Sequence, residues 1–413
     1  MPKIKKLIKS SKCTLSFANK VKIDNNNLFI DEYKRIMSTA IDLIWDFPKV
    51  PTLLPKELTS KIKSWLGARV IQSACKQASG IVRGTRKKQE KRKWKIQNLI
   101  DEGKFKQARK LSRIYEEASV TKPELDKVEP ELDERFITID FNNDTSFDGW
   151  IRIKSLVRDG SFEILIPIKK HKHFNKMLEK GKLKKGIRIS KHNITFMFEM
   201  PKVTPKTDGT IKGLDVGKTE LFVCSDGNKS NKCIHGHDCD SICKKMAKKK
   251  KGSKAFAKAN AHMENYLHWS IKQINVDNTK QLNRENIKNI KKGKRNKREM
   301  SHWPQARFFG LLDAKMHDEG VLVVKVNPTY TSQRCSACGF VCKRNRLGKR
   351  FKCTACGFTA DADLNASINI SLELAPIYFG SKQQSQHNNK IGFYWNVVGQ
   401  EHIVPVANKP NTS

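Results

Sequence analysis

Residues 320–372 read GVLVVKVNPTYTSQRCSACGFVCKRNRLGKRFKCTACGFTADADLNASINISL, and this stretch decides the fold of the C-terminal half of the chain. Its apolar, β-branched start, 321–326, is typical of a strand buried on both faces. Pro328 then favours a turn, because the residue before a proline is restricted. After the cysteines, apolar residues recur four apart from Leu364 onward, as on one face of a helix. We therefore expect a carboxylate at a helix start, beside a cysteine-rich insertion.

The insertion contains two CxxC pairs separated by fourteen residues: Cys335, Cys338, Cys353 and Cys356. Two such turns supply the four thiolates that tetrahedral zinc prefers, at the short end of zinc-ribbon spacing. Because sulfur fills all four positions, none is left for water, and we expect a structural Zn²⁺ ion. Zinc binding of this kind contributes on the order of 10 kcal/mol to local folding. Cys342 lies between the pairs but belongs to no CxxC motif.

The run Asn327–Gly339, the sequence CTACG at 353–357 and the sequence DLNASINI at 363–370 resemble the C-terminal motif of the TnpB proteins. These proteins are transposon-encoded, RNA-guided DNA nucleases related to the compact type V CRISPR effectors. The likeness is close in this region of the chain and much looser toward the N-terminus. It implies an α+β multidomain protein: a RuvC (RNase H-like) α/β nuclease domain with an inserted four-cysteine zinc ribbon, and an N-terminal β-barrel wedge domain interrupted by a helical recognition domain.

Patterning gives approximate boundaries for these domains. Residues 12–19 alternate like a strand, 28–45 and 58–118 have helical spacing, and 136–198 contains several short strands. Proline-containing linkers stand at 121–134 and 201–210. We expect the first wedge segment at 1–27, the helical recognition domain at 28–120, the second wedge segment at 121–205, the first RuvC segment at 206–330, the zinc ribbon at 331–358, and the second RuvC segment with a C-terminal tail at 359–413.

Charge identifies the class of partner. The chain of 413 residues has 81 Lys and Arg against 41 Asp and Glu, a net charge of +40. That excess exceeds what solubility requires and favours a polyanionic partner. No apolar run approaches the ~18 residues of a membrane span, and the basic N-terminus lacks the apolar core of a signal peptide. We therefore expect an intracellular protein of the cytoplasm or nucleoid, in a reducing compartment that suits its eleven cysteines.

Asp215 is the first candidate catalytic acid, in the sequence IKGLDVG at 211–217. Strand alternation places Leu214 and Val216 on one face, and Asp215 on the other face with the two glycines. Glycines beside a carboxylate leave the backbone bare, which predicts close approach of a metal ion and a phosphate. Taken alone, the pattern fits a turn-forming aspartate equally well.

Further acids strengthen the nuclease interpretation. In-line cleavage of a phosphodiester needs two divalent ions ~4 Å apart held by carboxylates, and Mg²⁺ takes a few hard oxygen ligands. The resemblance to TnpB implies that Asp215, Glu285 and Asp363 are catalytic and bind magnesium. Asp361 is an alternative to Asp363 as the third acid, but the family's Asp-x-Asn-Ala motif matches the sequence DLNA, which begins at Asp363. Asp361 is expected to cap the following helix.

The second acid departs from the family pattern. The strand before it is normally strongly apolar, whereas the segment before Glu285 contains one apolar residue, Leu282. Glu264 and Asp277 therefore remain alternatives.

Two basic clusters are candidates for contacts with nucleic-acid phosphates. The first includes Arg83, Arg86 and Lys87, and the second includes Lys248, Lys249, Lys250 and Lys254. Cations on consecutive helical turns can follow a nucleic-acid backbone, although such a run is also typical of a solvated helix face. Tyr266 and Trp269 could stack on an unpaired base, but we favour the helix core for both.

A second cysteine and histidine cluster comprises Cys233, His235, His237, Cys239 and Cys243. Its spacing matches no zinc motif, and ligands two apart cannot converge on a helix, so we favour the interpretation without a metal.

The hypothesis is an RNA-guided, Mg²⁺-dependent DNA endonuclease that cleaves guide-matched DNA next to a short flanking motif. Its partners would be a guide RNA and double-stranded target DNA, its cofactors Mg²⁺ and structural Zn²⁺, and a monomer is favoured. The alternative is a nuclease-silent RNA-guided DNA-binding protein or repressor, suggested by the weak strand before Glu285. The third hypothesis is a nuclease that needs no guide RNA and selects its substrate by DNA structure.

Overall fold

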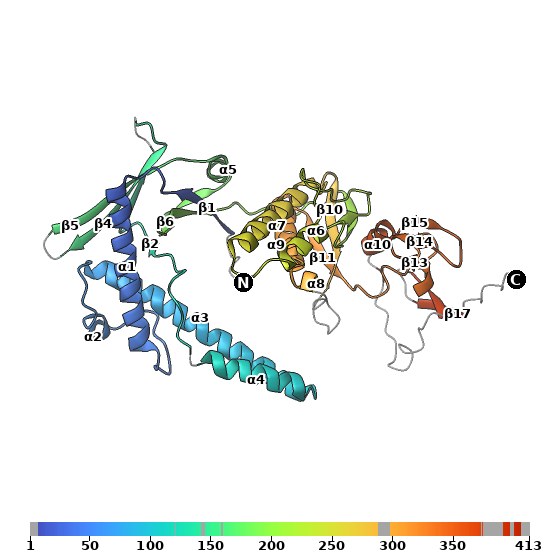
Figure 1. Cartoon of the computed structure of the whole chain (residues 1–413), viewed down its shortest axis with the longest axis horizontal. Helices are drawn as coiled ribbons and strands as arrows, with labels where there is room; N and C mark the ends of the chain where they lie inside the picture. Colours follow the sequence, from blue (N-terminus) through green and yellow to red (C-terminus); the bar gives the residue numbers. More distant parts are fainter. Residues whose placement is uncertain are drawn as a thin grey trace. The chain divides into compact units, whose positions relative to one another are not determined.

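The computed structural model of the chain describes residues 7–119, 121–141, 145–157, 160–287, 298–372, 374, 391–396 and 400–405. It divides into two compact units, Met1–Lys202 and Val203–Ser413, each of which mixes helices and strands (Figure 1).

The helices of the first unit are α1 (Lys20–Ile44), α2 (Lys56–Thr59), α3 (Ala68–Asp101), α4 (Phe105–Ser119) and α5 (Lys172–Lys180). α1 begins earlier than its apolar spacing indicates, because Asn19 caps it by accepting a hydrogen bond from the Lys22 amide at 3.0 Å. α3 packs against α1 and turns at Gly103 (φ 68°) into the antiparallel α4 (Figure 1). The two form the long helical hairpin of this unit.

Its strands form two antiparallel sheets that share one apolar core with α1 and α3. One sheet has the order β1-β7-β6-β2 and the other β3-β4-β5. The strands are β1 (Ile8–Thr14), β2 (Glu131–Leu132), β3 (Ile137–Asp140), β4 (Gly149–Val157), β5 (Gly160–Ile168), β6 (Lys182–Ile189) and β7 (Asn193–Glu199). β1 pairs with β7 along its whole length, so the segment before the helices joins the strands after them.

The prediction of the first strand at 12–19 is wrong in its bounds. β1 ends at Thr14 because the chain then turns, with the Ala18 amide donating to the Leu15 carbonyl at 2.9 Å, to reach the cap of α1. Sequence patterning also does not reveal α5 and β6, whose many lysines hide their apolar spacing.

The second unit is built on a four-stranded sheet of order β11-β10-β8-β9. β10 runs parallel to both β8 and β11, and β9 is antiparallel to β8. The elements are β8 (Thr210–Asp215), β9 (Val223–Cys224), α6 (Cys239–Ala247), α7 (Lys254–Gln273), β10 (Thr279–Glu285), α8 (Arg298–Ser301), α9 (Gln305–Asp318), β11 (Leu322–Val326) and α10 (Ala362–Ser371). Leu214 faces the core made with α6, α7 and α9, whereas Gly213 faces α10.

The expectation that 321–326 is buried on both faces is wrong. β11 is the edge strand of this sheet, and Leu322 is 52% exposed. Its β-branched composition reflects strand propensity, which does not distinguish a central strand from an edge strand.

Between β11 and α10 lies a small cysteine-rich subdomain. It contains β12 (Phe340–Val341), a short 3-10 helix (Lys343–Asn345), β13 (Arg346–Leu347), β14 (Arg350–Lys352) and β15 (Thr359–Asp361). β13, β14 and β15 form one sheet, and β12 pairs with β16 (Ile391–Trp395), which pairs with β17 (Gln400–Pro405). In the described portion of the chain, no helix is long and apolar enough to cross a membrane.

Gly213 is the point where α10 touches the sheet, and this corrects the expectation that the glycines beside Asp215 expose backbone to a metal ion. A Cβ at Gly213 would overlap the Ser367 carbonyl oxygen and lie 2.5 Å from the Ser371 amide nitrogen. A Cβ at Gly217 would lie 2.6 Å from the Glu220 carbonyl oxygen, within a tight turn. Both glycines therefore serve backbone packing.

Gly213→Ala is expected to destabilise the second unit by at least about 3 kcal/mol, because α10 must move off β8 to admit a methyl group. Urea unfolding of the full chain measures this loss. The matched control is Gly310→Ala in α9, where a Cβ meets no atom within 4 Å and helix propensity favours alanine. Equal stability of the two variants would contradict the packing argument.

Candidate functional site

The three acids proposed from sequence come from neighbouring elements of the second unit. Asp215 is the last residue of β8 and Glu285 the last residue of β10. These strands are parallel, with Leu214 opposite Arg284, so both acids lie at the same edge of the sheet. Asp363 is in the first turn of α10, which packs on β8. The structure therefore brings the three carboxylates into one region.

The charges of Glu285 and Asp363 act on Asp215. Burial, followed by the negative charges of Glu285 and Asp363, raises the pKa of Asp215 to about 7. Burial also raises the pKa of Glu285, opposed by a hydrogen bond from the Thr331 hydroxyl at 2.5 Å and by the charge of Arg346. Excess negative charge in a buried place is the condition under which carboxylates bind cations.

Two cations of the cysteine-rich subdomain contact Asp363, whose side chain is 6% exposed. The Arg346 guanidinium donates to Oδ1 at 2.7 Å, and the Lys349 ammonium contacts both Oδ2 and the Glu220 carboxylate. Sequence reasoning did not single out Arg346, Lys349, Glu220 or Thr331. A signal was present, because the basic sequence KRNRLGKR fills the loop between the CxxC pairs.

The alternatives to these acids lie elsewhere. Glu264, on α7, pairs with Arg307 at 3.0 Å. Asp277 precedes β10 and is therefore at the opposite end of that strand from Glu285. Asp361 caps α10, accepting from the amides of Asp363 and Leu364 at 2.9 and 3.0 Å, as the sequence predicted.

The polar character of β10 has a structural explanation. Asn283 is fully buried, and its amide donates to the Ile370 carbonyl at 3.1 Å, near the end of α10. Arg284 pairs with Asp313 of α9 at 2.9 Å and lies over the Phe309 ring. Polar residues thus bind β10 to the helices on either side of the sheet, where apolar residues would do so in an ordinary central strand.

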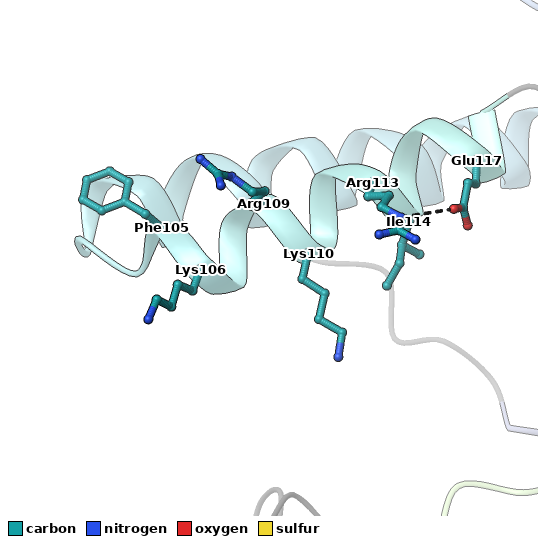
Figure 2. Close-up of a pocket in the computed structure, with 7 residues that line it drawn as sticks. All are labelled: Phe105, Lys106, Arg109, Lys110, Arg113, Ile114 and Glu117. Carbon is teal, nitrogen blue, oxygen red and sulfur yellow. Dashed lines mark ion pairs between the residues drawn. The ribbon is translucent and has the colours of Figure 1, made fainter.

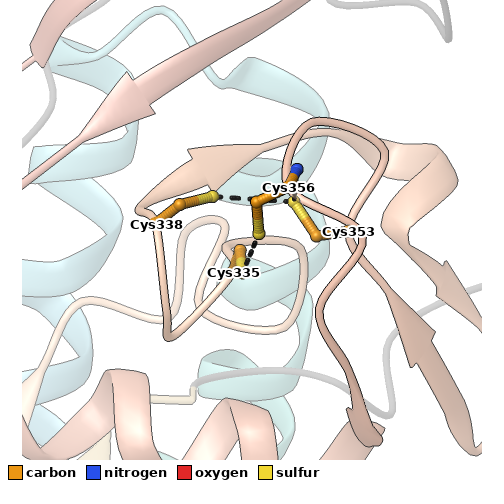
Figure 3. Close-up of side chains that lie close together, drawn as sticks. All are labelled: Cys335, Cys338, Cys353 and Cys356. Atoms are coloured by element: carbon orange, nitrogen blue, oxygen red, sulfur yellow. Dashed lines mark hydrogen bonds between the residues drawn. The ribbon is translucent and has the colours of Figure 1, made fainter.

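The four CxxC cysteines converge, as predicted (Figure 3). Their sulfur atoms all lie within 4.8 Å of one another, with Cys335–Cys356 at 3.8 Å and Cys338–Cys353 at 3.6 Å. Zinc–sulfur bonds of ~2.3 Å in a tetrahedron require sulfur–sulfur edges of ~3.8 Å, so the set fits one Zn²⁺ ion. Cys342 is buried in the adjacent core and is not a member of the set.

Asparagines of α10 attach this subdomain to the helix that carries Asp363. Asn365 accepts from the Ser336 amide at 2.9 Å and donates to the Arg334 carbonyl at 2.8 Å. Asn369 donates to the carbonyls of Thr331 and Arg334 and accepts from the Arg334 guanidinium at 2.7 Å. The cysteine set therefore fixes the position of the acid as well as its own loop.

The first basic cluster lies on α3, with different surroundings for its members. Arg83 donates to Thr52 at 3.0 Å. Arg86 is half-buried and donates to the carbonyls of Trp45, Phe47 and Pro48, which follow α1. Lys87 is exposed. Both arginines thus hold the loop after α1, and the lysine faces solvent.

The second basic cluster connects α6 to α7. Lys248, Lys250 and Lys254 are exposed, and Lys249 is half-buried with its carbonyl accepting from Arg298 at 3.2 Å. Tyr266 is buried, and Trp269 packs against the same core, which confirms the core interpretation of these aromatics.

A further basic surface, not expected from sequence, covers one face of α4 (Figure 2). Phe105 and Ile114 are exposed there, among basic side chains. The cations of this face are Lys106, Arg109, Lys110 and Arg113. An exposed aromatic ring among cations, such as Phe105 here, is typical of surfaces that bind single-stranded nucleic acid.

Comparisons with known proteins place similarity mainly in the C-terminal region. Residues 306–370 match the family described as Cas12f1-like, TNB domain. The chain is 44% identical over 59 residues to the CRISPR-associated endodeoxyribonuclease Cas12f1 of Sulfoacidibacillus thermotolerans, covering 14% of each protein. It is 52% identical over 52 residues to InsQ of Escherichia coli strain K12, named as a putative RNA-guided DNA endonuclease, covering 12% of this chain and 13% of InsQ.

A longer match is 25% identical over 232 residues to a Cas12f1 of an uncultured archaeon, covering 46% of this chain and 43% of that protein. The chain thus spans less than half the length of each of these relatives. Among solved structures, a Cas12f1-sgRNA-target DNA complex aligns with a TM-score of 0.43 at 16% identity, over 89% of this chain and 99% of that one. The mini-RNA-guided endonuclease CRISPR-Cas_phi3 aligns with a TM-score of 0.47 at 11% identity, over 88% and 92%.

Proposed function

We propose that this chain, which is related through its C-terminal region to the Cas12f1 and InsQ proteins, is an RNA-guided, Mg²⁺-dependent DNA endonuclease. One observation carries the proposal: Asp215 and Glu285 end neighbouring parallel strands, and Asp363 lies in the first turn of the helix that packs on β8, so the three acids share one region. The second unit then acts as a RuvC-type nuclease domain with its zinc ribbon. The first unit acts as the wedge and recognition domains.

The donor set suits magnesium. Three carboxylates supply hard oxygen ligands, and the negative charges of Glu285 and Asp363 beside Asp215 favour a divalent cation at this place. When bound there, Mg²⁺ would supply an activated water and stabilisation of the leaving oxygen. Thr331 orients Glu285, and Asn365 and Asn369 hold α10 so that Asp363 faces the other acids.

Cationic side chains of this chain would bind the phosphate group that is cleaved. Arg346 and Lys349 form ion pairs with Asp363 and are partly exposed. The phosphate oxygens of a nucleic-acid strand that enters the site can therefore accept hydrogen bonds from them. A guanidinium at this position stabilises charge that develops on the phosphate during cleavage.

Guide RNA and target DNA are the proposed partners. The net charge of +40 attracts the phosphate backbone of nucleic acids electrostatically. We assign phosphate binding to two exposed basic surfaces, the α4 face and the lysines between α6 and α7. Base pairing would carry most of the sequence specificity, with the protein reading a short flanking motif and the shape of the duplex. We expect the protein to act as a monomer.

The nuclease-silent alternative loses its support, because the weak apolar character of β10 is explained by Asn283 and Arg284. The test is to purify the chain with its bound RNA, sequence that RNA, and supply Mg²⁺ with DNA that matches it. Guide-directed cleavage supports the proposal. Binding without cleavage favours a silent nuclease, and cleavage that survives RNase treatment favours a guide-free one.

The pKa of Asp215 predicts how magnesium binding depends on pH. With a pKa of about 7 in the metal-free protein, Asp215 is protonated below that pH, and Mg²⁺ binding must release the proton. We expect the apparent Mg²⁺ affinity to rise about tenfold per pH unit toward pH 7 and to level off above it. The Mg²⁺ concentration for half-maximal cleavage, measured between about pH 6 and 8, reports this. A flat profile would contradict it.

A further inference from the structure

A second group of metal-binding side chains lies in the second unit, apart from both the three acids and the ribbon. Cys233, His235 and His237 are in the loop between β9 and α6, and His262 is on α7. The Cys233 sulfur lies 3.5 Å from His262 Nε2. The ring centres of His237 and His235 lie 5.4 and 6.1 Å from that of His262.

The structure divides the cysteine and histidine cluster seen in the sequence. Cys239 and Cys243 are buried in the apolar core of the unit. His262, which no sequence motif marks, takes their place. The objection that ligands two apart cannot converge on a helix does not apply, because residues 233–237 form a turn and only His262 is helical.

This turn resembles the first metal-binding turn of the ribbon but is one residue shorter, since its glycine follows the cysteine by three residues and not by four. The Cys233 amide donates to the His237 carbonyl and the Gly236 amide to the Cys233 carbonyl, both at 2.8 Å. In the ribbon, the Gly339 amide likewise donates to the Cys335 carbonyl at 2.9 Å. Gly236 and Gly339 both have positive φ, 73° and 79°, which closes the turn tightly. The first and last residues of the Cys233 turn therefore lie side by side.

One distance already matches a tetrahedral ion, whereas among the described residues only the four ribbon cysteines have all their ligand atoms at that spacing. Bonds of ~2.3 Å to sulfur and ~2.0 Å to nitrogen place the two ligand atoms ~3.5 Å apart, which is the Cys233–His262 separation. Two imidazoles on one such ion have ring centres ~5 Å apart. The ring centres of His237 and His235 lie slightly farther than this from that of His262. Metal binding would draw the two rings inward by rotation about their side-chain bonds.

A hydrogen bond at one ring nitrogen of His237 leaves its other ring nitrogen available to a metal ion. Ser241 Oγ donates to the Asp238 carbonyl at 2.9 Å and lies 3.5 Å from His237 Nδ1, so it can accept from that nitrogen. This leaves His237 Nε2 with a free lone pair, an arrangement typical of metal-bound histidines.

We propose that Cys233, His235, His237 and His262 bind a second Zn²⁺ ion. One thiolate and three imidazoles favour zinc over the magnesium or calcium that carboxylates select. The site joins the loop before α6 to the middle of α7. Asn231, Lys232 and Asp238 of that loop line a pocket together with Glu220 and Lys349. The ion would therefore hold one wall of this pocket in place, and Lys349 of the same pocket pairs with Asp363. Because His235 is exposed, it is the weakest ligand.

Zinc content tests the proposal without reference to DNA cleavage. The full chain, purified without a polyhistidine tag and dialysed free of loose metal, should contain two zinc ions per chain. His262→Gln should lose one of them and keep the ribbon ion. The matched control is His268→Gln, an exposed histidine on the same helix, which should keep both. One zinc in the wild type, or unchanged zinc in His262→Gln, would overturn the site.

A second measurement decides the question if His262→Gln does not fold. Metal-free wild-type protein is titrated with Co²⁺, whose thiolate charge-transfer absorption reports the number of sulfur ligands. Two equivalents should bind, one with the strong absorption of four thiolates and one with the weaker absorption of a single thiolate. Saturation at one equivalent refutes the site, and His235→Gln should weaken the second equivalent while leaving the first unchanged.

Discussion

Replacing Asp215 by asparagine is expected to abolish DNA cleavage and leave guide RNA and target DNA bound. Asparagine keeps the shape of the side chain but cannot supply the anionic oxygens that, on the proposed function, would hold magnesium at the end of β8. We expect a loss of at least about 10³-fold in the cleavage rate, equivalent to about 4 kcal/mol of transition-state stabilisation. Single-turnover cleavage and filter binding, measured on the same preparation, separate the two effects.

The same substitution should raise the stability of the metal-free protein. The folded-state pKa of Asp215, about 7, lies above the ~3.9 of a free aspartate. Its contribution to stability is therefore fully present below about pH 4 and is lost as the pH rises through 7. Asparagine cannot ionise, so the variant escapes this loss, and its Tm at about pH 8 should exceed that of the wild type.

The control is Asp208→Asn, an exposed aspartate before the other end of β8, which should change neither property. Cleavage that persists in Asp215→Asn would refute the catalytic assignment. A lower Tm would show instead that the variant loses activity by misfolding.

Removing the ribbon zinc is the second large effect that we expect. Cys353 is buried and close to the other three sulfurs, so Cys353→Ser removes one ligand and leaves the others without a stable ion. The metal supplies on the order of 10 kcal/mol to the folding of such a subdomain. Its loss should unfold the loop that carries Arg346 and Lys349 and abolish cleavage, although these residues are unchanged. Zinc content, limited proteolysis and cleavage measure the three consequences.

Cys342→Ala is the matched control, since Cys342 is buried in the same subdomain but lies outside the cysteine set. It should retain the zinc content of the wild type. If Cys353→Ser cleaved DNA at the wild-type rate, the ribbon would have no role in positioning Asp363.

Much of the site could be predicted because its signals are local. The CxxC pairs, the cap Asp361 and the acid in DLNA each fit within a few residues of sequence, and the structure places them as expected. Glu285 was harder to predict, because Asn283 and Arg284 replace the apolar residues that mark a central strand. The resemblance supplied that residue, and the parallel pairing of β8 and β10 now gives a physical reason to prefer it.

Other features depend on contacts between distant segments. Nothing near Gly213 in the sequence indicates that a helix about 150 residues later will pack on it, so the sequence alone suggests access for a metal instead. His262 carries no motif of its own and becomes a candidate ligand only when α7 is placed beside the loop at Cys233. The edge position of β11 likewise follows from strand order, which composition does not encode.

If the three acids form a nuclease site as proposed, the late position of Asp363 in the sequence also matters during translation. A ribosome that has completed β8 and β10 has already produced Asp215 and Glu285, but α10 has not been made and the sheet face at Gly213 is bare. On the proposed function, a nascent chain would lack a complete set of acids until α10 has emerged and the cysteine-rich subdomain before it has folded. The order of synthesis would then keep an unfinished chain inactive.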